Sequence, residues 1–214
     1  MDRIDPRLRQ AERQPPAPGV AVFDFDRTLI RQGSLGMLLR ALLGTRRYVS
    51  ACGAAAAAAL FAPARQRREI YRNTLLRRTL SGRRIAEVHA AAARIFPRLE
   101  WRPDSMDAYA RHRAAGRRIL VASGGLSCYM PILLRLKGLR IDGLLATEMV
   151  VEDGVLTGEL AAPACTGEEK ARRVEQWLAG TAGEIWCYGN WPHDAEMLAL
   201  SHHPTVIPAR RHQP

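Results

Sequence analysis

The sequence has 214 residues and a formal net charge of +11, and 47% of its residues are hydrophobic. A chain of this length can bury a full core and suits one domain with a sizeable insertion. Its four cysteines lie far apart without the spacing of metal ligands, so we expect reduced thiols and a cytoplasmic protein rather than a disulfide-stabilised one. No apolar signal sequence opens the chain, and residues 1–18 are polar, rich in proline and expected to be disordered.

The positive charge is unevenly distributed. Residues 31–118 have a balance of +14, whereas the rest of the chain has a balance of −3. Such a basic segment favours anionic partners, which include phosphorylated substrates, anionic lipid and nucleic acid. An arginine-coated helical surface explains most of these charges equally well.

The first half of the chain predicts one strand followed by helices. The apolar run in Gly19–Asp24 predicts a buried strand. Helical periodicity or composition follows, broken by glycine and proline, over five segments: Leu35–Leu43, Tyr48–Ala62, Arg65–Leu80, Arg83–Phe96 and Asp104–Ala115. This predicts a helical block of about 80 residues inserted after the first strand.

The second half predicts strands that alternate with helices. The strands are Arg118–Ala122, Leu144–Ala146, the hairpin Met149–Val151 and Val155–Leu160, then Glu184–Tyr188 and Pro204–Ile207. The helices are Ser127–Lys137, Gly167–Leu178 and Ala195–Leu200. Such alternation predicts an α/β fold with a parallel sheet and right-handed crossovers.

Two carboxylates follow the first strand directly. Asp24 and Asp26 are two residues apart, so the alternation of an extended backbone places them on the same side. Two like charges this close repel each other unless a cation lies between them or one of them holds a proton. Acidic residues after a strand can also be simple helix caps, but their position directly after a buried strand favours an active site.

The other candidate residues also follow strands or begin helices. Ser123 follows the second strand, next to glycines that let backbone amides approach an anion. Lys170 lies in the first turn of a helix, and Asn190 and Asp194 follow a strand four residues apart. Alone, these three could be a surface lysine, a turn and a cap. Their order along the chain, together with Asp24-x-Asp26-x-Thr28, favours one common site.

These motifs resemble the haloacid dehalogenase (HAD) superfamily, in its phosphoserine-phosphatase-like branch (HAD-IB type). The resemblance rests on D24-F-D-R-T28, S123-G-G, Lys170 and G189-N-W-P-H-D194, and it spans residues 19–207. It implies a Rossmann-like parallel sheet core formed by residues 19–33 and 117–208. It also implies an all-helical cap formed by residues 34–116.

The resemblance further implies a phosphatase that forms an aspartyl-phosphate intermediate. Asp24 would be the nucleophile, Asp26 the general acid and base, and Lys170 a positive charge beside them. Thr28, Ser123 and Gly124 would hold the phosphate. A Mg²⁺ ion would bind at an all-oxygen site, for which the candidate residues are Asp24, Asp26, Asn190 and Asp194.

The sequence departs from the family pattern at three points. Asn190 stands where the family usually has a metal-binding aspartate, which removes one negative charge and suggests weaker metal affinity. Arg27 replaces a common glycine, and its side chain is expected to point out of the site. Gln32-Gly33-Ser34 stands where phosphoserine phosphatases have a glutamate for the substrate amine, so phosphoserine is not the expected substrate.

Residues 48–64 carry no charge and are flanked by arginines. A packed cap helix explains this stretch, and so does a segment that contacts an anionic membrane at its inner face. The whole chain is also similar to bacterial phosphatidylglycerophosphatases of this superfamily, which have an apolar stretch at that place. The expected substrate is therefore either a soluble phosphorylated small molecule or a lipid phosphate.

Two hypotheses from other classes are weaker. A nucleic-acid-binding module would use the arginine-rich block, but the block lacks interleaved aromatic residues and any recognisable binding motif. A catalytically inactive homologue that binds a partner through its cap is disfavoured by the intact Asp24, Asp26 and Lys170. The sequence therefore favours a magnesium-dependent phosphomonoester hydrolase over a non-enzymatic anion-binding protein.

Overall fold

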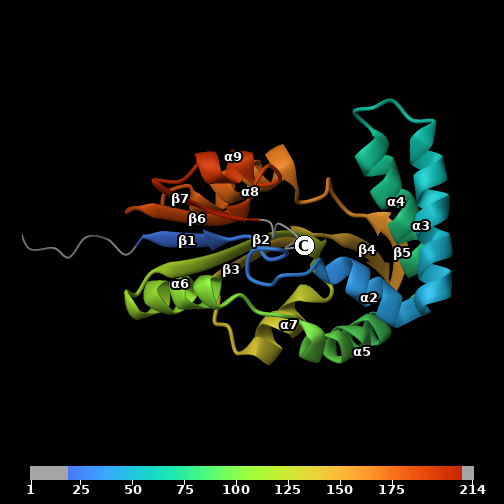
Figure 1. The fold of residues 1–214 in the computed structure, drawn as a ribbon, viewed down its shortest axis with the longest axis horizontal. Helices are drawn as coiled ribbons and strands as arrows, with labels where there is room; N and C mark the ends of the chain where they lie inside the picture. The colour runs from blue at the N-terminus through green and yellow to red at the C-terminus, as the bar shows by residue number, and fades with distance from the viewer. Residues whose placement is uncertain (1–18, 209–214) are drawn as a thin grey trace, which may run out of the picture.

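The structure is a computed structural model that describes residues 19–208. A five-stranded sheet with the order β3-β2-β1-β6-β7 forms its core, and each pair of neighbouring strands runs parallel (Figure 1). The strands are β1 (Val20–Phe23), β2 (Arg118–Leu126), β3 (Gly143–Thr147), β6 (Ile185–Asn190) and β7 (His203–Ile207). The predicted α/β class with a parallel sheet is confirmed. The expected disorder of residues 1–18 lies outside the described residues.

Strand β1 is buried on both faces. Val20 and Val22 belong to one apolar cluster, and Ala21 and Phe23 belong to another on the opposite face. The first face is covered by α8 (Gly167–Leu178) and α9 (Ala195–Ala199), and the second by α6 (Pro103–Ala114) and α7 (Met130–Lys137) (Figure 1). Because β1 is the central strand, its carboxyl end lies in the middle of the sheet edge.

A group of helices lies beyond that edge of the sheet (Figure 1). It consists of α2 (Ser34–Leu43), α3 (Thr45–Leu60), α4 (Arg67–Leu80) and α5 (Ile85–Ile95), and a 3₁₀ turn, η2 (Phe96–Arg98), follows. The alanine-rich helix α3 buries Ala51, Ala55 and Ala59 on one side, and α3 packs against α4. Small side chains let these two helices approach closely.

Two elements pack against a different part of the structure from the one to which their residue numbers assign them. Helix α6 falls within the cap range 34–116, yet it packs on the sheet, where His112 Nε2 lies 2.9 Å from the Tyr188 hydroxyl. The hairpin of β4 (Met149–Glu152) and β5 (Val155–Leu160) falls within the core range, yet it packs against α4. The exact domain boundary therefore stays a prediction.

The largest difference between a predicted and an observed element boundary is at the end of β2. Strand β2 continues to Leu126, beyond the expected end at Ala122, because the Ser-Gly-Gly segment stays extended and Leu126 pairs with Thr147 of β3. Helix α7 consequently begins at Met130 and not near Ser127. Ser123 and the two glycines after it, which the sequence predicts to follow the strand, instead form part of it.

Candidate active site

The loop after β1 holds the two carboxylates in place. The Asp24 N–H donates to the Tyr188 carbonyl oxygen at 2.9 Å, which continues the pairing between β1 and β6. The chain then folds back, because the N–H groups of Thr28, Leu29 and Ile30 all point to the Phe25 carbonyl oxygen, at 3.3, 2.9 and 3.1 Å.

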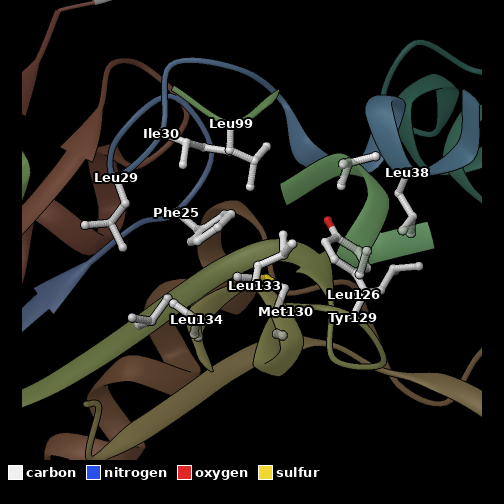
Figure 2. Close-up of a cluster of buried hydrophobic side chains, with 14 of the residues drawn as sticks. Phe25, Leu29, Ile30, Leu38, Leu99, Leu126, Tyr129, Met130, Leu133 and Leu134 are labelled. Carbon is white, nitrogen blue, oxygen red and sulfur yellow. The ribbon is translucent and has the colours of Figure 1, made fainter. Parts of the chain in front are cut away.

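Apolar packing of Phe25 holds this loop in place. The Phe25 ring is fully buried in a cluster that also contains Leu38 of α2 and Tyr129, Met130 and Leu133 near α7 (Figure 2). Burying a side chain of this size stabilises the fold by about 2–3 kcal/mol. The cluster thus fixes the loop while leaving Asp24 and Asp26 at the sheet edge.

Lys170 joins two of the predicted residues. Its Nζ lies 2.8 Å from Asp24 Oδ1 and 2.6 Å from Asp194 Oδ1, and the lysine is only 3% exposed. Burial alone would lower the pKa of Lys170, but the charges of Asp24 and Asp194 raise it well above its ordinary value. Lys170 is therefore a charged residue of the site and not the surface lysine that its helix position alone would suggest.

Asp26 has a different environment. Its Oδ1 accepts the Ser34 N–H at 2.8 Å, at the N-terminus of α2. Burial raises the pKa of Asp26 to about 6, against the lowering effect of the hydrogen bond from Ser34. A carboxyl group with a pKa near neutrality can both donate and accept a proton, as a general acid and base must.

Asn190 lies among the oxygen atoms of the other predicted residues. Its Nδ2 donates to Asp194 Oδ2 at 3.0 Å, to Asp24 Oδ2 at 3.2 Å and to the Asp26 carbonyl oxygen at 3.3 Å. These three oxygens therefore converge around one side chain. Asp194 also accepts the Asn190 N–H at 2.9 Å, so it supports the turn as well as the site.

Two of the three predicted phosphate-binding residues are less accessible than the carboxylates of the site. Thr28 and Ser123 are fully buried, and Thr28 Oγ1 has no hydrogen-bond partner among the described residues. Ser123 Oγ accepts the Gly125 N–H at 3.0 Å. Gly124 lies under Thr166, because a Cβ at position 124 would be 2.7 Å from the Thr166 methyl group.

A cavity of about 210 Å³ opens over the carboxylates. Its lining includes five predicted residues, Asp24, Asp26, Lys170, Asn190 and Asp194, but not Thr28, Ser123 or Gly124. The sequence did not single out the other lining residues as site residues: Arg27, Gly33, Arg68, Thr166 and His193.

Arg68 and His193, two of these additional residues, come from segments far apart in the chain. Arg68 of α4 reaches His193, with Arg68 Nη2 at 3.2 Å from His193 Nδ1. Arg27 is exposed at the rim of the cavity, with a φ of 65° in the region that favours glycine. The sequence predicts that the Arg27 side chain points out of the site, whereas Arg27 lines the cavity. No local pattern in the sequence indicates that Arg68 approaches the site.

The fold and the site define an α/β protein with a five-stranded parallel sheet, a buried carboxylate site at the carboxyl edge of that sheet, and helices that cover this edge. The family model described as haloacid dehalogenase-like hydrolase matches residues 21–199, and the chain belongs to this family. The resemblance inferred from the motifs is thereby confirmed at the level of the superfamily.

Relatives and solved structures agree with this assignment. The chain is 26% identical over 188 residues to protein CicA from Caulobacter vibrioides (strain NA1000 / CB15N), which covers 86% of this chain and 83% of CicA. It is 33% identical over 109 residues to Probable phosphatase Rv3661 from Mycobacterium tuberculosis (strain ATCC 25618 / H37Rv), but this match covers 49% of the chain and only 36% of that protein.

A structure of a phospho-aspartyl intermediate analogue of phosphoserine phosphatase has the same fold, with a TM-score of 0.60. It is 19% identical, and the match covers 86% of this chain and 84% of that one. At this identity the likeness supports the Rossmann-like fold and carries no information about the substrate.

The burial of Lys170 generates a prediction about stability. Replacing it in Lys170→Met leaves Asp24 and Asp194 buried without their cation, so we expect the free energy of unfolding to fall by about 3–5 kcal/mol. Urea denaturation at neutral pH measures the change. The matched control is Lys137→Met, which removes an exposed lysine and should change the free energy by less than about 1 kcal/mol. Equal losses in the two variants would contradict the proposed role of Lys170.

Proposed function

We propose that this hydrolase cleaves phosphate monoesters through a phosphorylated Asp24. The observation that carries the proposal is the pairing of two unlike carboxyl groups at one strand end. Asp24 is hydrogen-bonded to a charged lysine at 2.8 Å, whereas Asp26 accepts the backbone N–H of Ser34 at 2.8 Å. Burial raises the pKa of both carboxyl groups, that of Asp26 to about 6. Such a pair suits a nucleophile beside a general acid and base.

The reaction would proceed in two steps. In the first, an Asp24 carboxylate oxygen bonds to phosphorus, the bond from phosphorus to the ester oxygen breaks, and Asp26 donates its proton to the leaving alcohol. In the second, Asp26 takes a proton from water, the water oxygen bonds to phosphorus, and the bond from phosphorus to Asp24 breaks. Lys170 stays charged throughout and stabilises negative charge on Asp24 and the phosphoryl group.

Thr28, Ser123 and Gly124 are proposed to hold the phosphoryl oxygens. The Thr28 hydroxyl has no partner within residues 19–208, so it can donate to an incoming anion. Ser123 accepts a hydrogen bond from Gly125, which leaves its own hydroxyl proton available. None of the three residues lines the cavity, and the phosphoryl group would have to displace Thr166 to reach Gly124.

The donor set fits Mg²⁺. Within residues 19–208, no three His, Cys, Asp or Glu side chains form a cluster that could hold a metal, so a site here also needs the Asn190 amide and the Asp26 carbonyl. The oxygens of Asp24, Asp26 and Asp194 already converge on the Asn190 side chain, and a half-turn of that amide would add its own oxygen. Bound Mg²⁺ would neutralise negative charge on the phosphoryl group.

The nucleophile is tested by Asp24→Asn. The amide cannot attack phosphorus, so we expect turnover of an aryl phosphate to fall below about 5% of the wild-type rate, while circular dichroism shows a folded protein. The matched control is Asp107→Asn, an exposed position on α6, which should retain full activity. Substantial turnover by pure Asp24→Asn protein would refute the assignment, and trapping of a labelled phospho-enzyme in the wild type would support it.

The metal site is tested by Asn190→Asp. A carboxylate restores the negative charge that the amide lacks, so the apparent Mg²⁺ affinity should rise. Both the Mg²⁺ dependence of activity and the rise in Tm on Mg²⁺ addition report it. Gln176→Glu adds the same charge at an exposed position on α8 and should leave both titrations unchanged. If Asn190→Asp also leaves them unchanged, Asn190 is not a ligand.

A lipid phosphate is the second candidate substrate. The last residue of α3, Leu60, and the next residue, Phe61, are 64% and 90% exposed. Arg65, Arg67 and Arg68 follow in the turn and at the start of α4. Exposed apolar side chains beside arginines suit a peripheral contact with an anionic membrane at its inner face. No helix within residues 19–208 is long and apolar enough to cross a membrane.

Vesicle co-sedimentation distinguishes the lipid substrate from a soluble one. We expect binding to vesicles of anionic lipid at low salt, because each arginine near such a surface contributes about 1 kcal/mol. Binding should fall as salt rises and should weaken in Phe61→Ala and in the triple variant of Arg65, Arg67 and Arg68 to Ala. Vesicles of neutral lipid are the control. If anionic vesicles at low salt do not bind the protein, only the soluble small-molecule substrate remains.

A further inference from the structure

A second, larger cleft adjoins the reaction cavity. It has a volume of about 570 Å³ and lies between helix α4 and the segment that follows β5. The two cavities share Arg68 and Thr166 in their linings, so a ligand in one can extend into the other. The wall on the α4 side carries four arginines: Arg65, Arg68, Arg72 and Arg77.

The charges of this cleft are unbalanced. Arg77 forms an ion pair with Glu159 at 3.0 Å. Arg65, Arg68 and Arg72 form no ion pair with any described residue, and Glu69 is the one other carboxylate in the lining. Three positive charges against one negative charge leave the cleft with a balance of +2, which equals the charge of one phosphate dianion.

Arg72 points from the cap toward the proposed phosphate-binding loop. Its Nη1 donates to Thr166 Oγ1 at 3.4 Å, and its Nη2 would lie 4.0 Å from a Cβ on Gly124. Burial, and next the charge of Arg68, lower the pKa of Arg72. The two guanidinium groups therefore repel each other at the junction of the two cavities, and an anion bound between them would relieve this repulsion.

One further polar atom in the cleft is unsatisfied. Asn73 lines the cleft, and its Oδ1 is buried without a hydrogen-bond partner among the described residues. A buried acceptor without a donor destabilises the protein. A hydroxyl group on a bound molecule would supply the missing donor.

We propose that the arginine-lined cleft binds a second phosphate group of the substrate, so that the preferred substrates are bisphosphates. The inference rests on the proposed phosphatase activity and assigns its substrate class. Arg68 and Arg72 would be the specificity-determining residues, since a guanidinium group binds phosphate oxygens in a bidentate manner. A carboxylate in the same place would neutralise only half of the charge balance.

The proposal is tested with substrates that differ in one group. Linear alkyl monophosphates are compared with α,ω-alkanediol bisphosphates of two to six carbons, at a constant concentration of free Mg²⁺. After division by two for the two equivalent ends of a bisphosphate, we expect kcat/KM to favour the best bisphosphate by at least about tenfold, because bidentate guanidinium contacts to phosphate are strong. The ratio should fall toward one in Arg72→Gln.

The control is Arg78→Gln, which removes the same charge from an exposed position on the same helix outside the cleft lining. It should keep the wild-type ratio, and thermal denaturation should show both variants folded. If Arg72→Gln does not fold, Arg65→Gln takes its place, since Arg65 lines the larger cleft and does not line the reaction cavity.

Three results would overturn the proposal. These are a wild-type ratio near one, an equal fall in Arg78→Gln, and a preference for ω-carboxyalkyl phosphates over bisphosphates. Hydrolysis of an aryl phosphate without any bisphosphate preference would refute this inference and leave the proposed function intact. Calorimetric binding of the bisphosphate to Asp24→Asn protein tests the cleft without turnover, and there too Arg72→Gln should weaken binding by about tenfold.

Discussion

The buried ion pairs of Lys170 connect the parts of the site. The lysine comes from α8, one carboxylate from the end of β1, and the other from the turn after β6. Carboxylates placed this close together in a low-dielectric interior repel strongly, and the lysine charge offsets that repulsion. The arrangement requires that β1 and β6 be neighbours and end at the same edge, which the parallel order of the sheet ensures.

The two carboxyl groups after β1 differ because their surroundings differ. Asp24 is hydrogen-bonded to the charged lysine, whereas Asp26 accepts a backbone N–H at the N-terminus of α2. The loop that carries both carboxyl groups is held in place, since the Phe25 side chain is buried and three backbone N–H groups point to the Phe25 carbonyl oxygen. One short segment thus provides two acids with different hydrogen-bond partners.

Much of this site could be predicted from the sequence, because its residues follow strands. In a parallel sheet, the carboxyl ends of neighbouring strands meet, so Asp24, Asp26, Asn190 and Asp194 could be placed together from their order alone. Arg68 could not be predicted, since its presence at the cavity depends on how α4 packs over the core. The predicted end of the second strand comes too early, because two glycines in a row give no sign that the chain stays extended to Leu126.

The hairpin of β4 and β5 limits how the covering helices can move. The hairpin bonds to the chain after α4 through the pairs Gly82 N to Leu156 O, Leu156 N to Arg83 O, and Ile85 N to Gly154 O, at 2.8–3.0 Å. The helices are therefore attached to the core through the hairpin as well as through their own two chain connections. A swinging motion of α4 would have to carry the hairpin with it or break these bonds, each worth about 0.5–1.5 kcal/mol. Entry to the cavities is thus coupled to the flexibility of the two connections of this hairpin, residue 148 and the irregular segment 161–166.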